Sequence, residues 1–156
     1  MTATSSDSGT PQGSIVPAAR SIRPIDPGVT IGHVHLRTSD IDRVRAFYVD
    51  VLGFEIIRAD PSGYISIGRS GAVIGLNAVG RLPHAHPIKP GEGERRGLGV
   101  EIVVMTGGIE AAHAQATAAS AAQVSPLVRQ PWGLTDFRVL DPDGYYVRLT
   151  SLSSAA

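Results

Sequence analysis

The chain has no cysteine, few aromatic residues and no excess of charge of either sign. The missing cysteine excludes disulfide frameworks, thiolate zinc sites, iron–sulfur clusters and cysteine nucleophiles. Because 14 Lys and Arg residues balance 14 Asp and Glu residues, no sequence-wide positive field attracts nucleic acid or an anionic membrane. We therefore expect neither nucleic acid nor a membrane among the partners of this protein.

Long hydrophobic runs are also missing, and none reaches the roughly 20 residues that a membrane-spanning helix needs. Residues 1–28 are rich in Ser, Thr, Gly and Pro and lack the apolar stretch of a signal peptide. We expect a cytoplasmic location and a flexible leader over residues 1–28. The remaining length suits one domain, because a chain of roughly 150 residues folds without disulfides or a structural metal.

The sequence contains the same order of predicted elements twice. In the first half, alternation of apolar and polar residues predicts a strand beginning at Thr30, and helical spacing predicts a helix from Asp40 to Gly53. In the second half, a predicted strand, Leu98 to Met105, precedes an Ala-rich helix, Ile109 to about Ala121. Three short strand-like segments bounded by turn residues follow each helix: 54–58, 64–68 and 72–77, then 126–129, 134–140 and 145–150.

This repetition predicts an α+β fold of two tandem βαβββ modules, residues 29–80 and 97–152, joined by a Pro/Gly-rich linker, residues 81–96. Neither module is large enough to fold comfortably alone, so we expect a single domain over residues 29–152. The modules are expected to form a curved mixed sheet around a cleft, with the helices on the outer face. The strand residues predicted to face the helices are Val34, Leu36, Ile74, Leu76, Leu98, Val100, Ile102, Val147 and Leu149.

The opposite faces of the same strands mix charged, polar and small side chains. Such a mixture suits a wet, concave cleft better than a packed core, so this cleft is the predicted ligand site. The candidate site residues on these faces are His33, His35, Arg37, Asn77, Glu101, Tyr146 and Arg148, with Trp132 at a turn nearby.

Two parts of the sequence resemble a known superfamily. The run Ile31-Gly32-His33-Val34-His35-Leu36-Arg37, with Ser39-Asp40, Ala46-Phe47-Tyr48 and Leu52-Gly53-Phe54, resembles the opening module of the vicinal oxygen chelate superfamily. The segments Pro131-Trp132-Gly133, Asp136-Phe137-Arg138 and Asp141-Pro142-Asp143-Gly144 resemble the end of its second module. Glyoxalases, extradiol dioxygenases, fosfomycin-modifying enzymes and bleomycin-resistance proteins belong to this superfamily. The resemblance covers about residues 29–152 and implies the fold, but one such scaffold hosts unrelated chemistries.

The resemblance also implies where a metal centre would be built, and most of the ligands are replaced here. His33 matches the ligand on the first strand, whereas Gly75 stands where glyoxalase-like members carry Glu. Gly97 or Gly99 matches the second His of dioxygenase-like members, and Arg148 matches the Glu of the last strand. A catalytic divalent ion needs about three protein ligands and is repelled by a guanidinium. We expect no metal or other cofactor; His33 is the ligand if Fe, Mn, Zn or Ni binds.

Several candidate residues also have a purely structural interpretation. His33 and His35 either form a hydrogen-bonded wall or contact ligand and move protons, because His titrates near neutral pH. Arg148 either forms an ion pair with Glu101 on the neighbouring strand or grips an anionic or phenolate oxygen as a fork. Trp132 is either a core residue or an exposed stacking platform for a planar ligand.

The leading hypothesis is a small-molecule-binding protein of the glyoxalase/bleomycin-resistance type that works without a metal. Its ligand is an aromatic or polyfunctional organic molecule, held through His35, Arg37, Asn77, Trp132 and Tyr146. In the resistance-protein branch such clefts lie between two subunits, and enclosure of an open polar cleft favours the same arrangement here, so we expect a homodimer.

Two enzymatic alternatives use the same cleft. The first is a metal-free isomerase, cyclase or hydrolase, with His33 as general base, Glu101 as its orienter or as acid, and Arg148 stabilising an oxyanion or enolate. The second is a metal-dependent dioxygenase or glyoxalase-like lyase, which the first-strand motif favours and the replaced ligand positions oppose.

Overall fold

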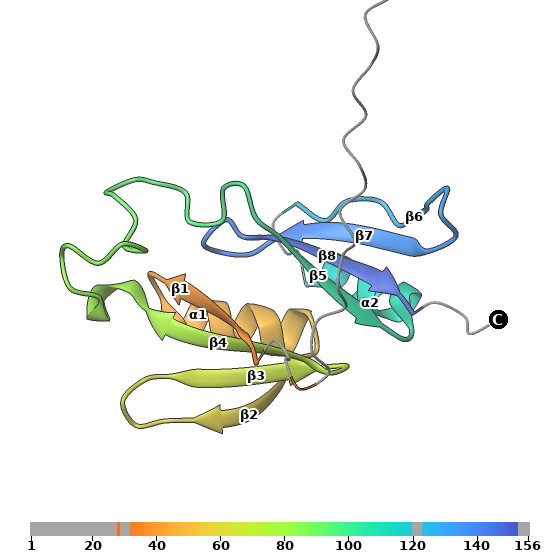
Figure 1. Cartoon of the computed structure of the whole chain (residues 1–156). Coiled ribbons are helices and arrows are strands. Elements are labelled where there is room, and N and C mark those ends of the chain that lie inside the picture. Colours follow the sequence, from red (N-terminus) through yellow and green to blue (C-terminus); the bar gives the residue numbers. More distant parts are fainter. Residues whose placement is uncertain (1–27, 29–31, 120–122, 153–156) are drawn as a thin grey trace, which may run out of the picture. The chain divides into compact units, whose positions relative to one another are not determined.

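The computed structural model describes residues 28, 32–119 and 123–152 (Figure 1). The chain divides into residues 1–30 and residues 31–156, and the description below concerns the second unit. The predicted leader therefore lies, apart from Gly28, outside the described residues. Within the described ranges, no helix is long and apolar enough to cross a membrane.

The first half of the described chain has the predicted βαβββ order. The helical part begins after Asp40, whose carboxylate accepts the Arg43 N–H at 3.0 Å. The predicted single helix becomes π-helical from Phe47 and stops before Gly53, where φ is +67°. The elements are β1 (Val34–Thr38), α1 (Ile41–Ala46), η1 (Phe47–Val51), β2 (Glu55–Ala59), β3 (Ile65–Arg69), β4 (Ala72–Ala78) and η2 (Val79–Arg81).

The second half repeats that order with different boundaries at its start. Its first strand was expected from Leu98 but begins at Glu101, because Gly99 has a left-handed φ of +78° that interrupts extended backbone. Leu98 and Val100 therefore lie outside the strand and are 74% and 52% exposed, so their predicted packing against a helix is wrong. The elements are β5 (Glu101–Thr106), α2 (Ile109–Ala118), β6 (Val128–Arg129), β7 (Thr135–Leu140) and β8 (Tyr146–Ser151).

The strands form two four-stranded mixed sheets in the orders β1-β4-β3-β2 and β5-β8-β7-β6 (Figure 1). We call them the first sheet and the second sheet. In each, the first and last strands of the module pair in parallel, and the other pairs are antiparallel. The predicted α+β architecture of two tandem βαβββ modules is confirmed.

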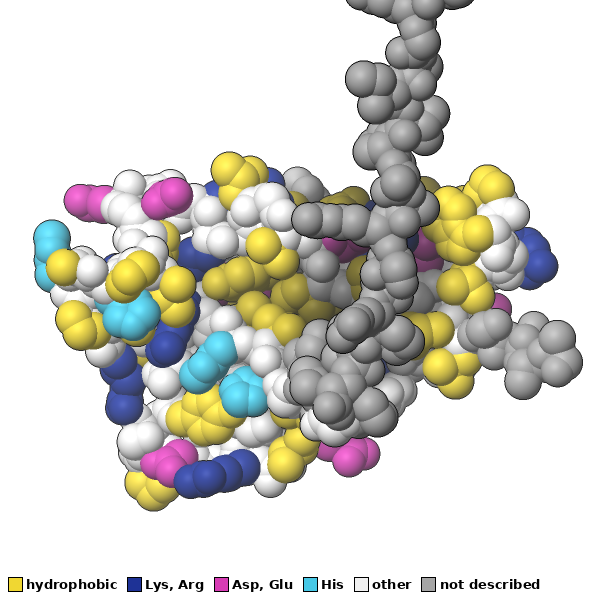
Figure 2. Space-filling model, viewed as in Figure 1, with side chains coloured by type: hydrophobic (Ala, Val, Ile, Leu, Met, Phe, Trp, Pro, Cys, Tyr) yellow, Lys and Arg dark blue, Asp and Glu magenta, His cyan; other side chains and the backbone are white. Residues whose placement is uncertain are grey.

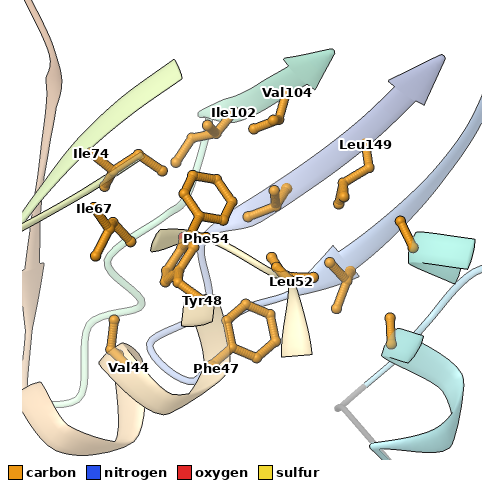
Figure 3. Close-up of a cluster of buried hydrophobic side chains, with 14 of the residues drawn as sticks. Val44, Phe47, Tyr48, Leu52, Phe54, Ile67, Ile74, Ile102, Val104 and Leu149 are labelled. Atoms are coloured by element: carbon orange, nitrogen blue, oxygen red, sulfur yellow. The ribbon is translucent and has the colours of Figure 1, made fainter. Parts of the chain in front are cut away.

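One hydrophobic cluster joins the two modules. Phe54 and Ile74 of the first module lie in the same cluster as Ile102 and Leu149 of the second (Figure 3). Side chains of α1, η1 and α2 complete the cluster on the helix side of both sheets. Val34, which was expected to face this core, is instead 41% exposed, because it begins the edge strand β1.

The turn between β7 and β8, Asp141 to Tyr145, is organised around a buried carboxylate. One oxygen of Asp141 accepts the backbone N–H groups of Asp143 and Tyr145 at 2.9 and 2.8 Å. The other accepts the hydroxyl of Tyr48 in η1 at 3.2 Å. The turn also explains Gly97, because a Cβ there would lie 2.3 Å from Tyr145 Cα.

The same turn fastens the second module to the first. Asp143 Oδ1 accepts the backbone N–H and the hydroxyl of Ser39 at 3.1 and 2.8 Å and pairs with Arg96 at 2.6 Å. The hydroxyl of Tyr145 accepts the N–H of Arg37 and donates to its carbonyl, each at 3.3 Å. The turn thus connects the start of the first module, the connector between the modules and the last hairpin.

Asp141 makes the stability of this fold depend on pH. Burial raises its pKa from 3.8 to about 6, an effect stronger than that of the two N–H groups that favour the charged form. The folded protein thus holds the proton more tightly than the unfolded chain. The resulting stabilisation is complete below the unfolded pKa of 3.8 and is lost as the pH rises through about 6.

We expect the substitution Asp141→Asn to remove this dependence, because the amide oxygen still accepts both N–H groups. Between about pH 4.5 and 7.5, the free energy of unfolding of the native chain should fall by about 2 kcal/mol relative to that of the variant. Urea unfolding at both pH values measures the difference, with Asp50→Asn as an exposed control. Parallel pH profiles of native chain and variant would show that the proton on Asp141 does not stabilise the fold.

Candidate functional site

A row of three rings lies on the face of the first sheet opposite the core. The ring of His35 in β1 contacts the ring of His33 at a centroid distance of 5.4 Å and that of Tyr64 at 5.3 Å, both edge to face. Both histidines are exposed, and histidine side chains reach the surface over β1 in Figure 2. The row offers a surface for a planar group.

Gly75 in β4 makes room for this row. It pairs with His35, and a Cβ at Gly75 would lie 2.8 Å from the Tyr64 hydroxyl and 3.1 Å from the His35 ring. Tyr64 was not among the predicted site residues, since it was assigned only to a strand segment. The glycine in the middle of a strand was the available signal, because such a glycine often marks a close approach.

Next along the same two strands are a donor and an acceptor without partners. Arg37 pairs with Asn77 in the register of β1 and β4. Arg37 Nε and Asn77 Oδ1 are both buried, and neither has a hydrogen-bond partner in the described part of the chain. A buried polar group without a partner costs about 1–3 kcal/mol. These two predicted ligand-binding residues are therefore in place to bind a molecule with both an acceptor and a donor.

A pocket of about 370 Å³ opens beside Arg37. Its wall combines His35 and Arg37 of β1 with Tyr145 of the turn and with the connector between the modules. The connector contributes Lys89 and Arg96, among others. Sequence reasoning missed these two cations, because residues 81–96 were treated only as a linker and no local pattern shows which sheet the linker covers.

Burial and two neighbouring positive charges act on the pKa of His35. Its pKa is lowered from 6.5 by partial burial, by the charge of Arg37 and by that of His33. The imidazole is therefore largely neutral at pH 7 and offers one donor and one acceptor.

The second sheet carries a balanced network of four charges on its equivalent face. Arg148 of β8 lies 3.6 Å from Glu101 and 3.9 Å from Asp136. Arg138 of β7 lies 3.5 Å from Glu101 and 3.0 Å from Asp136, whose side chain is fully buried. The predicted cross-strand ion pair of Arg148 with Glu101 is therefore present. Asp136 and Arg138 were not among the predicted site residues.

The three residues predicted to act together in catalysis are not gathered in one pocket, since His33 and Glu101 line different pockets and Arg148 lines neither of these two. His33 lines one of about 230 Å³ with Val73 and Val103, whereas Glu101 lines one of about 320 Å³ with Tyr146. Across residues 32–119 and 123–152, no hydrogen bond or ion pair joins His33 to Glu101 or Arg148.

Trp132, for which a core and an exposed position were both considered, is 59% exposed. It follows β6 and precedes Gly133, which has a φ of +92°. The core interpretation is therefore wrong, the role as a stacking platform stays a prediction, and none of the pockets named above includes this ring.

The registers of the two sheets correct one position of the implied metal centre. In each module the last residues of the two parallel strands pair with each other, Thr38 with Ala78 and Thr106 with Ser151. Counting back along the first strand from Thr38 and Thr106 aligns His33 with Glu101. Counting back along the last strand from Ala78 and Ser151 aligns Gly75 with Arg148. The second-module position is therefore Glu101 rather than Gly97 or Gly99.

This correction does not complete a metal site. His33 and Glu101 are two ligands, and the charge of Glu101 is already opposed by Arg138 and Arg148. The described residues contain no group of three or more His, Asp or Glu side chains that could hold an ion. The residues at the four positions do not fit the divalent site that the superfamily resemblance implies.

Comparison with known proteins agrees with this fold. The crystal structure of TioX from Micromonospora sp. ML1 is 24% identical, covering 76% of this chain and 97% of its own, with a TM-score of 0.62. The structure of lactoylglutathione lyase from Agrobacterium tumefaciens is 20% identical, covering 81% and 96%, with a TM-score of 0.59. These likenesses show the fold alone.

A curated relative and a family model add sequence similarity. Catechol-2,3-dioxygenase of Bacillus subtilis (strain 168) is 48% identical over 50 residues, 30% of this chain, and the match spans only 18% of that enzyme. The family model described as Glyoxalase/Bleomycin resistance protein/Dioxygenase superfamily matches residues 30–149. The chain belongs to the Glyoxalase/Bleomycin resistance protein/Dioxygenase superfamily.

Proposed function

We propose that this protein binds a polyfunctional, planar organic molecule on the exposed face of the first sheet. The observation that carries the proposal is the buried donor of Arg37 beside the buried acceptor of Asn77, both without partners in the described part of the chain. The rings of His35 and Tyr64 adjoin them and supply a surface for a flat group. A few fixed polar groups beside an aromatic wall are typical of small-molecule sites.

The proposed binding uses no metal. Of the four positions where the superfamily resemblance implies ligands, Gly75 has no side chain and Arg148 carries a positive charge. The guanidinium of Arg148 lies 3.6 Å from Glu101, so it occupies the carboxylate that an ion would need. An ion placed within roughly 4 Å of that guanidinium would be repelled by several kcal/mol.

We also propose that a second copy of the chain covers the exposed face of the second sheet. On the face of the second sheet that carries the charge network, Val103 and Met105 of β5 are each 43% exposed and Tyr146 is 37% exposed. Their neighbours Ile102 and Val104 are buried in the core, so the apolar character of β5 extends to both faces. A strand with apolar residues on both faces suits a covered position, and an isologous dimer covers it twice.

Ligand binding can be tested by titration calorimetry against a panel of planar antibiotics and phenolic metabolites. We expect at least one to bind, and Asn77→Ala to weaken it about tenfold, the loss of one hydrogen bond to a buried acceptor. Glu55→Ala, on the exposed strand β2, is the control. Mass spectrometry of the recovered ligand shows whether it was only bound or was converted to a product. Conversion that His33→Ala abolishes would favour the metal-free isomerase, cyclase or hydrolase instead. Absence of heat from the whole panel would contradict the proposal.

Removal of metal ions should leave the affinity unchanged. Protein dialysed against EDTA and checked by plasma mass spectrometry should bind the same panel ligand within about twofold of untreated protein, because the proposed contacts are all side chains. A near-stoichiometric metal that His33→Ala removes, together with binding that needs it, would favour the dioxygenase or lyase alternative.

Sedimentation equilibrium tests the dimer. We expect the native chain to be dimeric and Val103→Lys to weaken the dimer at least tenfold, because the substitution places a charge in the centre of the proposed interface. Leu152→Lys is the control, because Leu152 is also exposed, at 55%, but lies beyond the end of β8, and this substitution should have no effect. A native chain that stays monomeric at every concentration would rule out the proposed dimer.

A further inference from the structure

The pocket beside Arg37 has an excess of positive charge. Four of its lining side chains are cationic, namely Arg37, Lys89, Arg95 and Arg96, and only Glu94 is acidic. The whole chain has no net charge, so this excess is local. It differs from the face of the second sheet, where two arginines oppose two carboxylates.

Several donors in the pocket are free to bind a ligand. Within the described residues, no carboxylate lies at ion-pair distance from Arg37, and its Nε is buried without a partner. Arg96 uses one terminal nitrogen on Asp143, while its Nε is also buried and unpartnered. Lys89 donates to one carbonyl, that of Leu82 at 3.2 Å, which leaves further N–H groups of the ammonium.

Contacts from the Asp141–Tyr145 turn hold the backbone of Arg37 and the guanidinium of Arg96 before any ligand arrives. The Tyr145 hydroxyl fixes the backbone of Arg37 through two hydrogen bonds, and Asp143 fixes the guanidinium of Arg96 at 2.6 Å. Both anchors belong to the Asp141–Tyr145 turn, which is itself pinned to the first module. The donors of Arg96, whose guanidinium is held in this way, lose little conformational entropy on binding.

We propose that this pocket binds the oxyanionic group, a phosphate or carboxylate, of a small organic molecule, with Arg37 and Arg96 as forked donors and Lys89 as a point charge. Guanidinium forks match the geometry of both oxyanions, and charge-assisted hydrogen bonds are the strong ones. The volume of about 370 Å³ exceeds that of such a group. The rest of the molecule extends toward His35 and Tyr64, and this part of the inference rests on the proposed function.

The oxyanion subsite can be tested without knowing the complete ligand. Inorganic phosphate and succinate are titrated into ¹⁵N-labelled native protein, and the Nε–H signals of its arginines are followed by NMR. We expect saturable shifts of the Arg37 and Arg96 signals with one or both anions, and the anion that binds more tightly identifies the group. Shifts no larger than those caused by sodium chloride at equal ionic strength would overturn the proposal.

Substitutions locate the binding. Arg37→Gln and Lys89→Gln should each weaken the binding of phosphate or succinate at least tenfold, whereas Arg129→Gln, an exposed cation of β6, should have no effect. Equal weakening by all three would reveal a general charge effect and overturn the site. If Arg37→Gln does not fold, Lys89→Gln and the native titration still decide.

The two proposals fail in different ways. Anion binding that Lys89→Gln weakens, with no ligand found in the organic panel, would support the subsite and contradict the proposed function. A panel ligand whose affinity depends on Asn77, in a protein that binds neither phosphate nor succinate, would support the proposed function and contradict the oxyanion subsite.

Discussion

The carboxylate of Asp143 holds together the two parts of the candidate site, strand β1 and the connector between the modules. It binds Ser39 at the start of the first module and Arg96 in the connector, and its own place is set by the buried carboxylate of Asp141. Breaking a buried ion pair leaves one charge uncompensated and costs several kcal/mol. A turn of five residues thereby fixes where the connector lies and which cations meet beside β1.

The two sheets share one topology but differ in the charge on their exposed faces. The internal repeat aligns Gly75 with Arg148, so the same register position is empty in the first sheet and charged in the second. In the second sheet the charge is balanced, because Glu101 and Asp136 lie within ion-pair distance of Arg148. In the first sheet the empty position makes room for Tyr64, and the nearby charge of Arg37 stays unbalanced. The difference at this position thus separates the charge network of the second sheet from the row of rings on the first.

Much of the fold could be predicted from the sequence, because it follows from local periodicity. Alternation assigned His35, Arg37 and Asn77 to one face of the first sheet, and the registers agree. The predictions failed where backbone conformation overrides alternation, as at Gly99, which delays β5 and leaves Leu98 exposed. The cations of the connector could not be predicted in the same way. Their positions are set by contacts between segments about 50 and 100 residues apart, such as Arg96 with Asp143 and Arg37 with Tyr145, which no short pattern encodes.

The pair of hydrogen bonds between Tyr145 and Arg37 also affects how the chain behaves toward other chains. β1 is an edge strand, and an edge strand presents unpaired N–H and C=O groups on which a foreign strand can add. At Arg37 one phenol hydroxyl occupies both groups, accepting from the N–H and donating to the carbonyl. A side chain of the second module thus takes the place of a neighbouring strand near the C-terminal end of β1. The edge is interrupted there, which protects the sheet against extension into aggregates.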